Sequence, residues 1–136
     1  MDSSVLLRIV LGQTGRLREW RRARRWLACE LIRLECLRTL DRARIRLNLP
    51  DEEIAQRRAG VLEALDAFDL IRLDRSILAR AAEPFPTGLG TLDALHLASA
   101  LAIRPQLPDL VFATHDRELA VAATAVGFPV TGVSLR

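Results

Sequence analysis

The sequence of 136 residues contains no lysine and no tyrosine, only two cysteines, and no long apolar run. Phosphoacceptor modules that bind Mg²⁺ through an acidic cluster need a lysine near the phosphate, so its absence argues against that class. The apolar runs fall short of the ~18 to 20 residues that a membrane helix needs, and the N-terminus does not follow the pattern of a signal peptide. We therefore expect a cytoplasmic protein with no membrane contact.

The two cysteines, Cys29 and Cys36, stand seven residues apart and form no Cys-x-x-Cys pair. With only two histidines in the chain, a thiolate-rich zinc site is improbable, and we expect both thiols to be reduced and buried. No Gly-x-Gly-x-x-Gly follows an expected strand, which argues against a dinucleotide-binding domain.

Every one of the 20 basic residues is arginine, and the net charge is only +3. A GC-rich coding sequence explains this general bias. Six arginines nevertheless gather between Arg16 and Arg25, interleaved with Trp20 and followed by Trp26. This segment either contacts RNA phosphates or carboxylates of a partner protein, or forms a solvated helix face whose apolar residues pack inward. We favour the second interpretation for most of the segment.

Half of the residues are hydrophobic, which favours one packed domain over residues 1–136. Short β-like runs alternate with segments of helical periodicity, a pattern typical of an α/β fold with a mostly parallel central sheet flanked by helices. Strands are predicted at 25–28, 68–73, 110–113 and 130–135. Helices are predicted at 4–11, 15–24, 29–45, 50–67, 75–82, 91–103 (with Thr91 as its cap) and from 116 or 117 to 127.

Four acidic residues lie at the ends of apolar segments that are far apart in the sequence: Asp2, Glu35, Asp93 and Asp116. Ligands of parallel α/β sheets bind outside the carboxyl ends of the strands, and all four acids can face that crevice. Carboxylates gathered in this way repel one another unless a cation neutralises them. The set therefore indicates a site for a hard divalent metal, and with it phosphate chemistry.

The surroundings of these acids resemble the PIN-domain ribonucleases, and specifically the VapC toxins of bacterial toxin–antitoxin pairs. The resembling segments are Asp2-Ser3-Ser4, Glu35 with Arg38, the block Thr91–Ala98 around Asp93, Thr114-His115-Asp116, and Gly127-Phe128-Pro129-Val130. They extend over essentially the whole chain, and the block around Asp93 is the most specific of them.

The resemblance implies an endoribonuclease that uses Mg²⁺ or Mn²⁺ to activate water. Its catalytic, metal-binding acids would be Asp2, Glu35, Asp93 and Asp116. Because Mg²⁺ takes only one or two direct carboxylates, some of the four would act through water. The resemblance also implies an RNA substrate, a homodimer, and a cognate antitoxin protein that binds across the active-site groove, with contact to DNA only through that antitoxin.

The chain departs from the family at two acids. Relatives usually carry several apolar residues before the residue that corresponds to Asp2, where they form the central strand, and here only Met1 precedes it. We expect either a shortened central strand or a start further upstream, with the α-amino group close to the metal site. Glu30 stands where the family has a small residue. Glu30 and Glu35 lie ~140° apart on a helix, so both cannot face one metal, and the motif favours Glu35.

Other polar residues have supporting roles in this interpretation. Ser3 or Thr114 would position the attacking water or the phosphate, and Arg38 would either brace Glu35 or contact the antitoxin. We interpret His96 and His115 as structural, since a metal-activated water needs no imidazole. The alternative function is a degenerate PIN-like domain that binds RNA or protein without catalysis; the shortened start supports it and the intact acid set opposes it.

Overall fold

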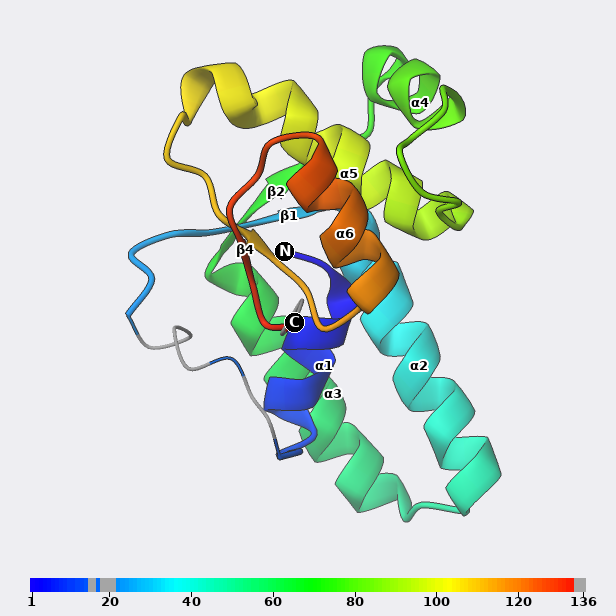
Figure 1. The fold of residues 1–136 in the computed structure, drawn as a ribbon. Coiled ribbons are helices and arrows are strands. Elements are labelled where there is room, and N and C mark those ends of the chain that lie inside the picture. Colours follow the sequence, from blue (N-terminus) through cyan, green and yellow to red (C-terminus); the bar gives the residue numbers. More distant parts are fainter. Residues whose placement is uncertain (15–16, 18–21, 134–136) are drawn as a thin grey trace.

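The computed structural model describes residues 1–14, 17 and 22–133, in which helices alternate with short strands (Figure 1). In chain order the elements are α1 (Ser3–Val10), β1 (Trp26–Cys29), α2 (Leu31–Leu47), α3 (Asp51–Asp66), β2 (Phe68–Ile71), α4 (Arg75–Ala82), α5 (Thr91–Ile103), the 3₁₀ turn η2 (Arg104–Gln106), β3 (Phe112–Ala113), α6 (Arg117–Ala125) and β4 (Val130–Thr131). This order confirms the predicted α/β fold, and most elements lie within two residues of their expected bounds.

The strands form two parallel pairs, as expected for strands joined through helices. In the first pair, Trp26 of β1 lies opposite Phe68 of β2, and their rings stack with centroids 6.3 Å apart. In the second, Phe112 of β3 lies opposite Val130 of β4. The parallel arrangement is confirmed. β1 has its predicted length of 4 residues, whereas β2, β3 and β4 are shorter than the predicted strands.

Residues 1 and 2 lie between the two pairs. The amino group of Met1 donates a hydrogen bond to the carbonyl oxygen of Leu27 in β1, at 2.6 Å. The N–H of Asp2 donates to the carbonyl oxygen of Ala113 in β3, at 3.2 Å. These two residues therefore occupy the place of a central strand, and beside Met1 a cavity of about 530 Å³ opens, lined in part by Val111.

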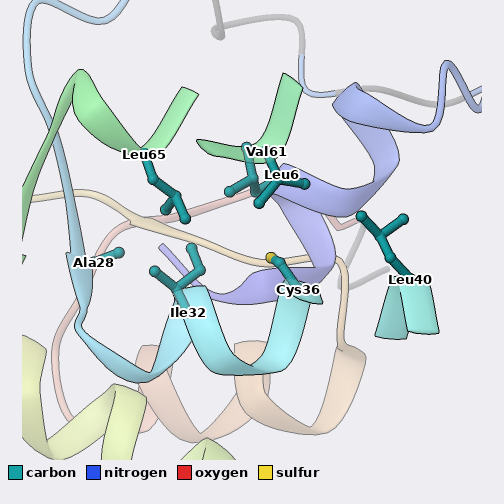
Figure 2. Close-up of a cluster of buried hydrophobic side chains, with 7 residues drawn as sticks. All are labelled: Leu6, Ala28, Ile32, Cys36, Leu40, Val61 and Leu65. Carbon is teal, nitrogen blue, oxygen red and sulfur yellow. The ribbon is translucent and has the colours of Figure 1, made fainter. Parts of the chain in front are cut away.

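The first hydrophobic core lies between α1, β1, α2 and α3 (Figure 2). Leu6, Ile32, Cys36 and Val61 are fully buried there, and burying an aliphatic side chain of this size stabilises a fold by about 1.5 to 3 kcal/mol. Successive helix residues are about 100° apart, so with Cys36 in the core, Glu35 lies at the edge of that face. Packing of α2 thus decides the direction of Glu35.

Both cysteines are buried and unpaired, as predicted. Burial raises the pKa of the Cys36 thiol to about 12, and the charges of Glu35 and Asp2 add to the shift. The thiol is therefore neutral at physiological pH and, being uncharged, a poor metal ligand.

A second core joins α5, α6 and β3, and Leu97, Leu119 and Phe112 are buried in it. The rings of Phe112 and Phe128 lie 5.8 Å apart, and the small side chains of α6 on this face bring the helix close to the sheet. This packing fixes the first turns of α5 and α6, where two of the four acids lie.

Two expectations about helices need correction. The cap of α5 is Gly90 and not Thr91, which is the first helical residue; the carbonyl oxygen of Gly90 accepts the first helical hydrogen bond, from Ala94. The helix predicted at 15–24 lies mostly outside the described residues, and its described end at 22–24 is turn and bend. None of the helices in the part of the chain that is described is long and apolar enough to cross a membrane.

Candidate metal centre

Asp2 is buried, with only 4% of its surface exposed, and it lies at the N-terminus of α1. One carboxylate oxygen accepts a hydrogen bond from the hydroxyl of Ser4 at 2.7 Å, and the other accepts from the hydroxyl of Thr114 at 2.8 Å. The serine that contacts this acid is therefore Ser4, whose position two residues after Asp2 gave no clear signal in the sequence. Ser4 also accepts a hydrogen bond from the backbone N–H of His115.

Thr114 connects two of the four acids. Its side chain is fully buried; its hydroxyl donates to Asp2 and accepts from the backbone N–H of Asp116 at 2.9 Å. Asp116 in turn caps α6, because one of its carboxylate oxygens accepts from the N–H of Leu119 at 2.9 Å. The Thr114 hydroxyl thus uses its O–H and one of its two acceptor sites to hold Asp2 and Asp116 in place.

Asp93 lies in the first turn of α5 and is partly buried. Burial raises the pKa of its carboxyl group, and the negative charges of Asp116, Asp2 and Glu35 raise it further, while His96 acts in the opposite direction. A Cβ atom at Gly90 would lie 3.5 Å from one oxygen of Asp93, so the glycine leaves room beside the carboxylate. The four predicted acids therefore act on one another electrostatically.

Glu35 reaches across from α2 to α5. Its carboxylate accepts a hydrogen bond of 2.5 Å from Nε2 of His96, a residue 61 positions away in the sequence. The competing residue, Glu30, accepts from the N–H of Leu73 instead and lies at the end of β1. Glu30 and Glu35 thus have different partners, as expected for two residues ~140° apart on a helix.

The remaining predicted residues have other partners. Arg38 pairs with Asp41 at 2.9 Å on an exposed surface and does not brace Glu35. His115 makes a structural contact at 2.6 Å, between its Nδ1 and the carbonyl oxygen of Gly132. Ser3 is partly exposed at the start of α1, and its predicted role stays a prediction. The arginine segment with Trp20 lies largely outside the described residues.

The donor set suits a hard divalent cation, which prefers carboxylate oxygens. Yet among the residues that the structure describes, no three His, Cys, Asp or Glu side chains stand close enough to hold a metal between them. Asp2, Glu35 and Asp116 are each turned toward a hydrogen-bond partner, whereas Asp93 carries a raised pKa that an adjacent cation would reverse. The residues fit a cation that keeps several waters and takes one or two direct carboxylates.

The α-amino group of Met1 adjoins this site and is buried. Burial lowers its pKa from 8.0 to about 6, against the opposing influence of Asp2 and Cys29. The unfolded chain therefore binds more protons than the folded chain between pH 6 and 8, so stability rises with pH across this window. We expect the free energy of unfolding, measured by urea denaturation with EDTA present, to fall by about 2 kcal/mol from pH 8 to pH 6.

Protein acetylated at its N-terminus provides the control for this prediction, since the amide that replaces the amine does not titrate. The cavity beside Met1 offers space for the acetyl group. The acetylated protein should lose less stability over the same pH range, and an identical loss in both forms would show that other groups cause it.

The chain is similar to known proteins over nearly its whole length. A family model described as the PIN domain matches residues 1–124. Ribonuclease VapC46 of Mycobacterium tuberculosis (strain ATCC 25618 / H37Rv) is 33% identical over 134 residues, which cover 98% of this chain and 96% of the relative. Ribonuclease VapC47 of Mycobacterium tuberculosis (strain CDC 1551 / Oshkosh) is 30% identical over 132 residues, which cover 94% of this chain and 91% of the relative.

Proposed function

This chain belongs to the PIN-domain family, and from that premise we propose that it is a metal-dependent endoribonuclease, the toxin of a type II toxin–antitoxin pair. Both relatives are named as VapC ribonucleases and match nearly the full length of the chain. The observation that carries the proposal is the gathering of carboxylates from distant segments: Thr114 joins Asp2 to Asp116, and the charges of Asp116, Asp2 and Glu35 help to raise the pKa of Asp93.

In this proposal, Asp2, Glu35, Asp93 and Asp116 are the catalytic acids and hold Mg²⁺ or Mn²⁺, directly or through water. The bound cation would supply charge neutralisation at the phosphate and activation of the attacking water. Asp93 is the best candidate for direct contact, because its carboxylate lies beside the space left by Gly90 and is repelled by the other acids.

In this proposal Thr114 holds two of the acids. Its hydroxyl donates to Asp2 and accepts from the backbone N–H of Asp116. A hydroxyl has a second acceptor site, so the predicted contact of Thr114 with the water or the phosphate stays a prediction. Ser4 supports Asp2 from the other side. Together, these hydroxyls fix the acidic side chains before a cation binds, which reduces the reorganisation that binding requires.

The partners follow from the same premise. The substrate is RNA, and a cognate antitoxin protein binds the toxin and links it to DNA. We propose that the chain is a homodimer and that Arg38, whose side chain is 60% exposed on α2, is available to a carboxylate of the antitoxin.

One observation favours a second candidate, an RNA- or protein-binding domain without catalysis. The buried amino group of Met1 interacts with Asp2, and when protonated it would compete with a cation for that carboxylate. Because the pKa of the Met1 amine is about 6, the amine is mostly neutral at pH 7 and competes little with a cation for Asp2.

The test of the proposed function is cleavage of RNA by the purified chain. A panel of transcribed stem–loop RNAs should be cleaved at internal phosphodiester bonds in the presence of Mg²⁺ or Mn²⁺. Cleavage should stop when EDTA is added and return with excess metal, because the acids alone provide no neutralisation for the phosphate. RNA that is bound but stays intact at every metal concentration would favour the domain without catalysis.

A further inference from the structure

His96 is buried within the site, although the sequence suggested only a packing role for it. Its side chain is 2% exposed, and that of its partner Glu35 is 13% exposed. In the other ion pairs between described residues, every side chain is at least 31% exposed. Contacts of that exposed kind contribute little, whereas a buried, charge-assisted hydrogen bond is short and strong.

One particular nitrogen of the His96 imidazole, Nε2, makes the contact with Glu35. An ionised carboxylate can only accept hydrogen bonds, so Nε2 of His96 carries the proton and donates it to Glu35. The other ring nitrogen, Nδ1, is buried, and no hydrogen-bond partner for it occurs in the described chain. His96 is therefore committed to Glu35 through Nε2.

The position of His96 links two acids of the site. It follows Asp93 by three residues on α5, so both lie on one side of that helix. Glu35 comes from α2, and its long side chain has three rotatable bonds that need to be fixed before it can face Asp93.

We propose that His96 is a positioning residue, whose imidazole holds the Glu35 carboxylate beside Asp93 and thereby strengthens binding of the divalent cation. The inference rests on the proposed function and deepens it. Partners of this kind, which hold a metal ligand by hydrogen bonding, typically contribute about 10- to 100-fold in metal affinity or activity.

The experiment measures Mn²⁺ binding to the full chain by calorimetry, together with RNA cleavage and thermal unfolding. His96→Leu fills the buried space but lacks the donor, and we expect its Kd for Mn²⁺ to rise by about 10- to 100-fold. His96→Gln places an amide nitrogen at a similar reach and should bind Mn²⁺ nearly as wild type does. His96→Asn carries the same amide one methylene shorter and should behave like the leucine variant, which also covers the case that His96→Leu fails to fold.

A Glu35→Gln background supplies the double-mutant cycle. If His96 acts through Glu35, adding His96→Leu to Glu35→Gln causes little further loss of Mn²⁺ affinity. Wild-type affinity in a folded leucine or asparagine variant would overturn the inference, as would equal losses in the leucine and glutamine variants, which would indicate packing alone. A wild-type chain that neither binds Mn²⁺ nor cuts RNA would instead overturn the proposed function.

Discussion

Replacing Asp93 by asparagine is expected to abolish RNA cleavage while leaving the fold intact. The negative charges of all three other acids help to raise the pKa of Asp93, as expected for a carboxylate at the centre of the proposed metal site. Removing this carboxylate should therefore weaken binding of the metal. Even residues that only support a metal ligand typically contribute about 10- to 100-fold, and loss of a direct carboxylate should reduce cleavage by at least about 100-fold. Single-turnover cleavage at saturating Mn²⁺ measures this loss.

Asp93→Asn should also change the thermal stability of the chain, in a direction that depends on whether Mn²⁺ is present. A carboxyl group whose pKa is raised in the folded state destabilises the fold at neutral pH when it is ionised. Asp93→Asn removes that repulsion, so in EDTA the variant should melt at the same temperature as wild type or higher. With Mn²⁺ present, the order should reverse, because ligand binding stabilises only the chain that binds it.

Asp66→Asn is the matched control, since it removes the same charge from an exposed residue at the end of α3. It should retain wild-type cleavage and the wild-type response to Mn²⁺. If Asp93→Asn cuts RNA at the wild-type rate, Asp93 is not a catalytic acid and the assignment of the site around it is wrong.

The acids that the sequence could predict are those with informative neighbours. Asp93 and Asp116 lie at starts of helices that follow from local periodicity and capping, and Asp116 does cap α6. Glu35 could be separated from Glu30 by helical geometry, which is also a local rule. The structure places all these acids in one electrostatic neighbourhood, and their roles as metal ligands stay predictions that the variants test.

The contacts that hold the acids could not be predicted, because each joins segments distant in sequence. Thr114 reaches Asp2 across 112 residues, and His96 reaches Glu35 across 61. Nothing in a local pattern specifies such pairs, since they depend on how helices pack on the strands. For the same reason, periodicity did not predict the bridge that Met1 and Asp2 together form between β1 and β3.

Gly132 lies behind this site, and replacing it by alanine is expected to destabilise the chain by about 3 to 5 kcal/mol. An added Cβ would lie 2.3 Å from the carbonyl oxygen of Thr114, a backbone atom that cannot move without shifting β3 against β4. Gly132 also has φ of +100°, a conformation that side chains rarely adopt. Any chain that still folds should cut RNA more slowly, because displacing Thr114 displaces the hydroxyl that holds Asp2.

Substitutions at two other glycines separate the two causes of this loss of stability, the steric overlap and the backbone strain. Gly12 has φ of +64° but nothing within 4 Å of an added Cβ, so Gly12→Ala should cost only the strain of the left-handed conformation, about 1 to 2 kcal/mol. Gly88 likewise has open space and no positive φ, so Gly88→Ala should change stability by less than about 0.5 kcal/mol. Urea denaturation of the three variants measures the series. A loss for Gly132→Ala no larger than that for Gly12→Ala would mean that the strand pair yields to the new methyl group, and Thr114 would then not be held rigidly enough to fix the two acids it joins.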